Sequence, residues 1–191
     1  SNTMNSHSKS LMDMKLSIGL PVRNGEKFIC KCLDSLLAQT FKNFEIIISD
    51  NASTDDTQKI CQEYSKKDER IRYIKHGKNM GFKLNFNFVL KQAKNDFFMW
   101  IGVDDFLLPN YVKKNMEILA SNSGVVGSVS KINSYNFSES KIDKIDSKFF
   151  NFTKKLRIRF KNISIFSISG TYDEKVRKYL TGSTCQIIYG I

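Results

Sequence analysis

The sequence predicts an α/β fold in which a mostly parallel central sheet carries helices on both faces. Two observations predict it: short apolar runs rich in β-branched residues, and longer segments between them in which apolar residues recur at helical spacing. Strands and helices that alternate in this way build a parallel sheet with crossover helices. With 191 residues and 41% hydrophobic content, the chain is long enough for one domain with its own core.

The first 133 residues supply the alternating elements. Each predicted strand is an apolar or alternating run bounded by turn-forming residues. These strands are residues 16–22, 44–50, 70–76, 96–103 and 124–132. The predicted helices are residues 26–40, a segment from the turn "NASTDDT" to about residue 64, residues 86–93, and a segment that Pro109 opens at its first position.

The pattern weakens after residue 133. Residues 133–148 are predicted to be a polar surface loop, residues 152–169 one or two strands with basic outward faces, and residues 171–180 a short helix. Residues 1–14 are polar and are predicted to be a disordered tail. The chain ends in the apolar run "CQIIYGI" without a closing turn, which we interpret as a domain that continues beyond it.

Charge and cysteine content narrow the class of protein. The net charge is +11, and residues 141–191 hold 11 Lys or Arg against 4 Asp or Glu. Such a segment suits a solvated surface, or contact with anionic lipid or a phosphorylated ligand. No nucleic-acid-binding motif accompanies the charge, so no nucleic-acid partner is expected. The four cysteines lack zinc-type spacing and predict reduced thiols in a cytoplasmic protein, one that can also sit peripherally at the inner face of a membrane.

Three polar loops follow predicted strands and should meet at one edge of the sheet. They are "PVRNG", "SDNAS" and "VDDF". Ligands in such sheets bind beyond the carboxyl ends of the strands. The adjacent carboxylates Asp104 and Asp105 have two explanations: they turn the chain and cap a helix, or they hold a cation that in turn holds a phosphate.

Two stretches together resemble the family 2 inverting glycosyltransferases of bacterial polysaccharide and glycolipid synthesis. They are "IGLPVRNGEKFICKCLDSLLAQTFKNFEIIISDNASTDDT" and "KNMGFKLNFNFVLKQAKNDFFMWIGVDDFLLPNY", within residues 15–120. The resemblance implies the GT-A nucleotide-diphospho-sugar transferase fold, with a nucleotide-binding half at 15–133 and a partial acceptor-side half at 134–191. Two alternatives are disfavoured. The sequence has no G-x-G-x-x-G after the first predicted strand, which a dinucleotide-binding fold would carry, and it has no basic glycine-rich loop near its start, which a nucleotidyltransferase would carry.

The resemblance also implies an activity and roles for residues. A sugar would move from a nucleotide-diphosphate donor, in our expectation a UDP-sugar, to a saccharide or lipid-linked acceptor. The cofactor would be Mg²⁺ or Mn²⁺, held by Asp105 with help from Asp104, although Gly102 stands where many relatives carry a third acid. The implied nucleotide-binding residues are Pro21, Val22, Arg23, Asn24, Glu26, Asp50, Asn79, Gly81, Lys83 and Asp104.

Asp50 and the catalytic base are left with alternatives. Asp50 would accept a hydrogen bond from the ring N–H of uracil, or it caps the following helix with Ser53 or Thr54. An inverting transferase needs a general base. The late acids offer only Asp173 and Glu174 as weak candidates, so the base is unassigned. The alternative function is therefore a nucleotide-sugar-binding domain without transfer activity of its own.

Overall fold

The computed structural model describes residues 10–121, 127–130, 134–136, 141–143, 158–160, 163–166 and 188–191. Its helical elements are η1 (Leu11–Asp13), α1 (Ile29–Leu37), α2 (Thr57–Lys67), α3 (Phe82–Lys91) and α4 (Tyr111–Ser121). Its strands are β1 (Leu16–Val22), β2 (Phe44–Asp50), β3 (Ile71–Lys75), β4 (Phe97–Trp100), β5 (Gly127–Ser130), β6 (Ser134–Asn136), β7 (Lys141–Asp143), β8 (Ile158–Phe160), β9 (Ile163–Phe166) and β10 (Ile188–Gly190).

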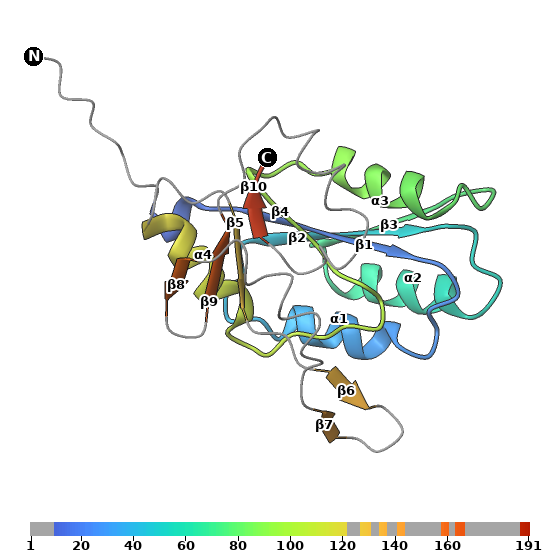
Figure 1. Cartoon of the computed structure of the whole chain (residues 1–191). Coiled ribbons are helices and arrows are strands. Elements are labelled where there is room, and N and C mark those ends of the chain that lie inside the picture. Colours follow the sequence, from blue (N-terminus) through green and yellow to red (C-terminus); the bar gives the residue numbers. More distant parts are fainter. Residues whose placement is uncertain are drawn as a thin grey trace, which may run out of the picture.

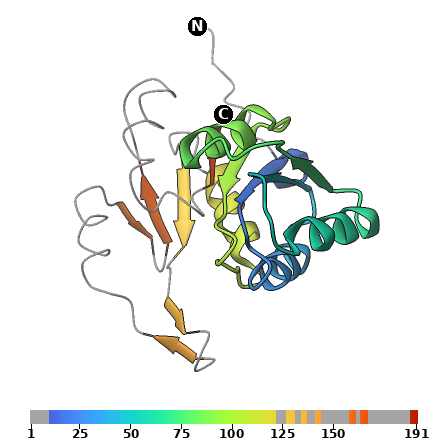
Figure 2. The ribbon, with the colours of Figure 1, turned by 90° about the vertical axis from the view of Figure 1, so that its right-hand side faces the viewer.

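The main sheet has the strand order β3-β2-β1-β4-β10-β5-β9-β8. The strands from β3 to β4 run parallel, and the pairings from β4 onwards are antiparallel. Most paired residues belong to the parallel half, so the predicted mostly parallel α/β sheet is confirmed. Figure 2 shows the parallel half wrapped by helices, with β5, β8 and β9 standing beside it.

Helices cover both faces of the parallel half, as predicted. In Figure 1 the helix α3 lies on one side of the sheet and α1 and α2 lie on the other. The side chains of β1 alternate accordingly: Leu16, Ile18 and Leu20 belong to the larger core, which includes residues of α1, α2 and α4. The smaller core lies between α3 and the opposite face of the sheet and contains Ile47, Phe86, Val89, Phe98 and Trp100. Burial on both faces explains why β1 and β2 are nearly continuous apolar runs.

Some predicted boundaries were wrong, for identifiable reasons. The helix predicted from residue 26 begins at Ile29, because Glu26 is bonded to the loop after β2 through both its amide and its carboxylate. Pro109 does not open a helix: its carbonyl accepts the Thr40 amide at 2.8 Å, and α4 begins at Tyr111. The strand predicted at 96–103 ends at Trp100, where the chain turns toward Asp104.

The N-terminal and later segments also differ from expectation. Residues 10–14 are not disordered: the Ser10 hydroxyl accepts the Met12 amide, and Met14 is fully buried. The expected loop at 133–148 contains β6 and β7, which pair as a two-stranded antiparallel sheet. The final apolar run supplies β10, which lies between β4 and β5. Residues 1–9 and the helix predicted at 171–180 lie outside the described residues.

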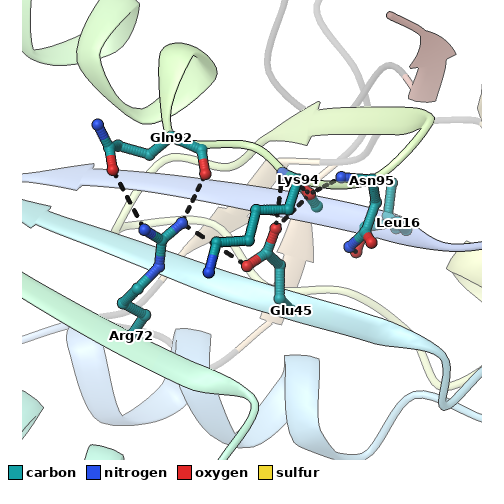
Figure 3. Close-up of polar contacts among 7 residues, drawn as sticks. Leu16, Glu45, Arg72, Gln92, Lys94 and Asn95 are labelled. Carbon is teal, nitrogen blue, oxygen red and sulfur yellow. Dashed lines mark hydrogen bonds and ion pairs between the residues drawn. The ribbon is translucent and has the colours of Figure 1, made fainter.

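A polar cluster secures the edge of the sheet opposite the polar loops (Figure 3). The Glu45 carboxylate accepts hydrogen bonds from the Ser17 hydroxyl at 2.7 Å and the Lys94 amide at 3.0 Å, and it lies 3.7 Å from the Arg72 guanidinium. Arg72 also donates to the side-chain and backbone oxygens of Gln92. These bonds fix the turn between α3 and β4 against β1, β2 and β3, so we assign the cluster a structural role.

Candidate functional site

The loops after β1 and β2 are joined by a set of hydrogen bonds at the carboxyl edge of the sheet. The Gly25 amide donates to the Thr57 hydroxyl at 2.8 Å, and the Asn24 amide donates to the Ser53 hydroxyl at 2.9 Å. The Asn24 side chain accepts the Thr54 amide at 2.8 Å. Because each loop satisfies the other's backbone groups, the two loops form one preorganised surface.

Two residues in this surface hold left-handed backbone conformations. Asn24 has φ 53° and Ala52 has φ 59°. Asn is well represented in this region, whereas Ala costs free energy there. The Ala52 amide donates to the Asp50 carbonyl at 2.9 Å, which helps to hold the turn. Backbone strain of this kind is found where a functional geometry is imposed by its surroundings.

Asp50 ends β2 and is fully buried. One carboxylate oxygen accepts the Ser53 amide at 2.8 Å, and the other accepts the Tyr73 hydroxyl at 2.6 Å. Burial, followed by the hydrogen bond to Asp50, raises the pKa of Tyr73, so this hydroxyl stays a donor. Asp50 therefore stabilises the turn that follows it. It does not cap α2, which begins at Thr57. Each oxygen still has a lone pair that can accept a further bond.

Asn51 fastens the loop after β3 to this turn. The side-chain NH₂ group of Asn51 donates to the side-chain oxygen of Asn79 at 2.8 Å, and the side-chain oxygen of Asn51 accepts the backbone amide of Met80 at 2.7 Å. Gly81 has φ 86°, a left-handed position that suits glycine, and it directly precedes α3. Asn51 thus holds the predicted residues Asn79 and Gly81 beside Asp50, a role that was not predicted from the sequence.

The carboxylates of Asp104 and Asp105 converge over Gly102. One oxygen of each lies 2.9 Å from the position that a Cβ atom on Gly102 would take. The Asp105 amide closes the turn by donating to the Gly102 carbonyl at 3.1 Å. Neither aspartate caps the next helix, because α4 begins only at Tyr111. Two convergent carboxylate oxygens at a glycine suit a divalent cation, whose remaining ligands would be phosphate oxygens and water.

Gly25 brings the carboxylate pair to the other two loops. A Cβ atom on Gly25 would lie 2.7 Å from side-chain atoms of both Val22 and Val103. The loop after β1 therefore packs directly on the residue that precedes Asp104, and it also bonds to Thr57 after β2. Gly25 lies in the predicted site loop "PVRNG", but its packing role was not predicted, because it depends on Val103, which is distant in sequence.

Two buried thiols lie beneath the acidic residues. Burial, followed by the charges of Asp105 and Asp104, raises the pKa of the Cys32 thiol, whose sulfur lies 3.7 Å from the Gly102 carbonyl oxygen. Burial, followed by the charge of Asp50, raises the pKa of Cys61 to about 12. Both thiols are therefore neutral, and neither is suited to act as a nucleophile.

The remaining predicted residues fall into three groups. Pro21 and Val22 are buried at the end of β1, with Val22 in the larger core. Glu26 joins the loops by accepting the Asp56 amide at 2.9 Å. Arg23 and Lys83 are exposed. The base candidates Asp173 and Glu174 lie outside the described residues. Of the basic stretch 154–161, only Ile158–Phe160 is described, as strand β8. Among the described residues, no group of three or more His, Cys, Asp or Glu is arranged to hold a metal.

Comparison with known proteins identifies the family. The chain matches the family described as Glycosyl transferase family 2 over residues 17–173. The chain belongs to this family. It is 35% identical to glycosyltransferase GlyA of Streptococcus pneumoniae over 134 residues, and 33% identical to putative glycosyltransferase EpsH of Bacillus subtilis over 111 residues. These alignments cover 68% and 58% of this chain, but only 18% and 32% of the two relatives.

Solved structures agree with the family 2 assignment. The chain resembles the crystal structure of S. aureus TarS 1–349 in complex with UDP-GlcNAc, with a TM-score of 0.55 and 30% identity over 59% of this chain and 33% of TarS. It also resembles mannosyltransferase PcManGT from Pyrobaculum calidifontis, solved with GDP-Man and Mn²⁺, with a TM-score of 0.55. That likeness covers 88% of this chain and 47% of PcManGT at 18% identity, and it shows the fold alone.

Proposed function

We propose that this chain binds a nucleotide-diphosphate sugar, a UDP-sugar, at the carboxyl edge of β1, β2 and β4, for transfer with inversion to a saccharide or lipid-linked acceptor. The observation that carries the proposal is the convergence of the Asp104 and Asp105 carboxylates over Gly102, beside loops that are bonded into one surface. Membership of glycosyl transferase family 2 and the likeness to a UDP-GlcNAc complex of TarS support it.

The proposed roles follow from position and chemistry. Asp50, already oriented by Ser53 and Tyr73, accepts the ring N–H of uracil through a remaining lone pair. Asn79 and Gly81 line the base and ribose from the loop after β3, and Pro21 to Glu26 line the nucleotide from the loop after β1. Exposed Arg23 and Lys83 can attract the diphosphate as the donor arrives.

Asp105 and Asp104 are the residues proposed to hold Mg²⁺ or Mn²⁺. Gly102 fits this role because any side chain there would displace the two carboxylate oxygens from their common point. When bound, such a cation neutralises charge on a diphosphate. The protein's own contribution is to hold two carboxylates close together before the donor binds, so that less reorganisation is needed on binding.

A second candidate function is donor binding without transfer by this chain alone. This alternative is favoured because each acid of the described site already has another role. Asp50 accepts hydrogen bonds from Ser53 and Tyr73, and Asp104 and Asp105 are proposed to hold the cation. Proton removal from the acceptor hydroxyl needs a further base, for which Asp173 and Glu174 stay proposals.

The proposed setting is the cytoplasm, including the inner face of a membrane. Free thiols at Cys30, Cys32 and Cys61 suit a reducing compartment. None of the helices in the described part of the chain has the length and apolarity that crossing a membrane requires. A lipid-linked acceptor would bring the protein to the membrane surface, and residues 154–161 are one proposed contact.

Calorimetry with UDP tests the proposal directly. We expect UDP to bind more tightly with Mn²⁺ or Mg²⁺ than with EDTA, because the cation links the phosphates to Asp104 and Asp105. Equal binding in EDTA would remove the metal role. Tighter binding of GDP or CDP than of UDP would overturn the proposed pairing of uracil with Asp50, while leaving the site itself in place.

A further inference from the structure

The segment that forms β3, α3 and their flanking turns has a one-sided charge. Residues 70–95 contain seven Lys or Arg and no Asp or Glu. The two arginines are neutralised by acids outside this stretch: Arg70 lies 2.7 Å from Asp68, and Arg72 lies 3.7 Å from Glu45. The five lysines of the stretch, in contrast, have no carboxylate of the described residues within ion-pair distance. All five are exposed: Lys75, Lys78, Lys83, Lys91 and Lys94.

Helix α3 carries two of these lysines, Lys83 and Lys91, together with apolar side chains, and Lys94 follows its end. Lys75 belongs to β3 and bonds to Gln58 of α2, on the other side of the sheet. The inner side of α3 packs on the sheet through Asn85, Phe86 and Val89. Helical periodicity turns Leu84 and Lys91 to the opposite side. Leu84 is 60% exposed on this side. The outer side of α3 therefore combines positive charge with an exposed aliphatic group.

A second large apolar side chain lies at the start of the same helix. Phe82 is 63% exposed, and its ring packs at 4.0 Å on the ring of Phe86. Because Phe86 belongs to the smaller core, Phe82, one turn earlier, lies on the sheet side of α3 and not on the outer side that carries Leu84 and Lys91. In Figure 1, α3 is the labelled helix on this side of the parallel half, while α1 and α2 lie on the other side.

We propose that the outer side of α3 docks on a membrane surface that contains anionic lipid. Lipid phosphates complement Lys83, Lys91 and Lys94, which have no carboxylate of the described residues at ion-pair distance, and Leu84 is suited to enter the boundary between headgroups and acyl chains. An acidic protein would also attract the lysines, but a stable protein interface needs a contiguous apolar centre rather than a single leucine set among lysines.

Docking through α3 would bring the candidate site to the lipid surface. Gly81, just before α3, accepts a hydrogen bond from Asn51 at 3.4 Å, and Asn51 follows Asp50 directly. The start of α3 and the polar loops therefore share one edge of the sheet. Docking of this kind requires neither donor binding nor sugar transfer.

Vesicle co-sedimentation of the full 191-residue chain tests the proposal. We expect binding to vesicles of phosphatidylcholine with phosphatidylglycerol, little binding to phosphatidylcholine alone, and weaker binding at high salt. Lys91→Gln with Lys94→Gln should lower the partition coefficient about tenfold or more, since each lysine contributes about fivefold at an anionic surface. Leu84→Ser should lower it about tenfold through lost apolar contact.

The matched control is Lys66→Gln with Lys67→Gln. It removes the same charge from exposed positions at the end of α2, on the other side of the sheet. Equal losses in the two lysine pairs, or unchanged binding by Leu84→Ser, would overturn the proposal. A loss that follows only Lys154→Gln with Lys155→Gln would also overturn it. UDP binding, measured in each variant, should be unchanged, which separates this proposal from failure of the donor site.

Discussion

Charge can be separated from shape at Asp104 and Asp105. Asn turns a chain as readily as Asp, but it lacks the negative charge that a cation needs. Asp105→Asn should therefore weaken Mn²⁺-dependent UDP binding about tenfold or more, while the melting temperature of the ligand-free protein stays near that of the wild type. Calorimetry and thermal unfolding give the two values. A loss of stability with unchanged binding would show that the pair only shapes the turn.

The hydrogen bond from Tyr73 to Asp50 offers a second test at single residues. Tyr73→Phe removes a 2.6 Å bond to a buried carboxylate and should cost about 1.5–3 kcal/mol of the free energy of unfolding. If Tyr73 orients Asp50 toward the base, the variant should also discriminate less between UDP and its N3-methyl analogue. Tyr64→Phe is the control, because it removes a similar 2.6 Å bond to Asp34 between α1 and α2. Unaltered discrimination would leave Tyr73 a structural residue.

At the scale of elements, Gly25 determines how closely the loop after β1 packs on the loop after β4. A Cβ atom at Gly25 would meet Val22 and Val103 at 2.7 Å, and overpacking of this kind costs about 1–3 kcal/mol. Gly25→Ala should lower both the melting temperature and the affinity for UDP with Mn²⁺, because Val103 precedes Asp104. Gly77→Ala is the matched control, since no atom lies within 4 Å of its added Cβ. Restoration by Val103→Ala would confirm the contact, and equal effects of both glycine variants would refute it.

The elements also show why sequence patterns predicted some features and missed others. The bounds of β1 and β2 were predicted correctly, because strands buried on both faces are continuous apolar runs between polar loops. Asp104 and Asp105 were predicted as a pair for the same reason, since they follow a buried strand. The roles of Asn51 and Tyr73 were missed, because they depend on bonds between loops that are distant in sequence. The insertion of β10 was missed because three residues carry too little pattern to reveal their partners.

At the scale of the whole molecule, the two halves of the sheet meet through β10. Tyr189 pairs with Phe98 of β4 on one side and with Gly127 of β5 on the other. Ile188 is fully buried in the larger core, whereas Ile191 is 48% exposed. Ile188→Ala should therefore lower the free energy of unfolding by about 2–5 kcal/mol, and Ile191→Ala should have little effect. Urea denaturation measures both. Equal stability of the two variants would show that β10 contributes nothing to the joint core.

Sugar transfer is the property that requires most of the molecule. We expect residues 1–191 to bind donor and to hydrolyse it slowly, but to transfer little sugar. The described site leaves no acid to act as general base, because Asp50 accepts bonds from Ser53 and Tyr73 and the proposed role of Asp104 and Asp105 is to hold a cation. Water needs no acceptor pocket, so hydrolysis can continue without a base for the acceptor. The assay follows UDP release from a UDP-sugar with and without an acceptor extract. Rapid acceptor-dependent release would contradict the expectation. In that case, a decrease of about 10²–10⁴-fold in Asp173→Asn or Glu174→Gln, with UDP affinity unchanged, would identify the base.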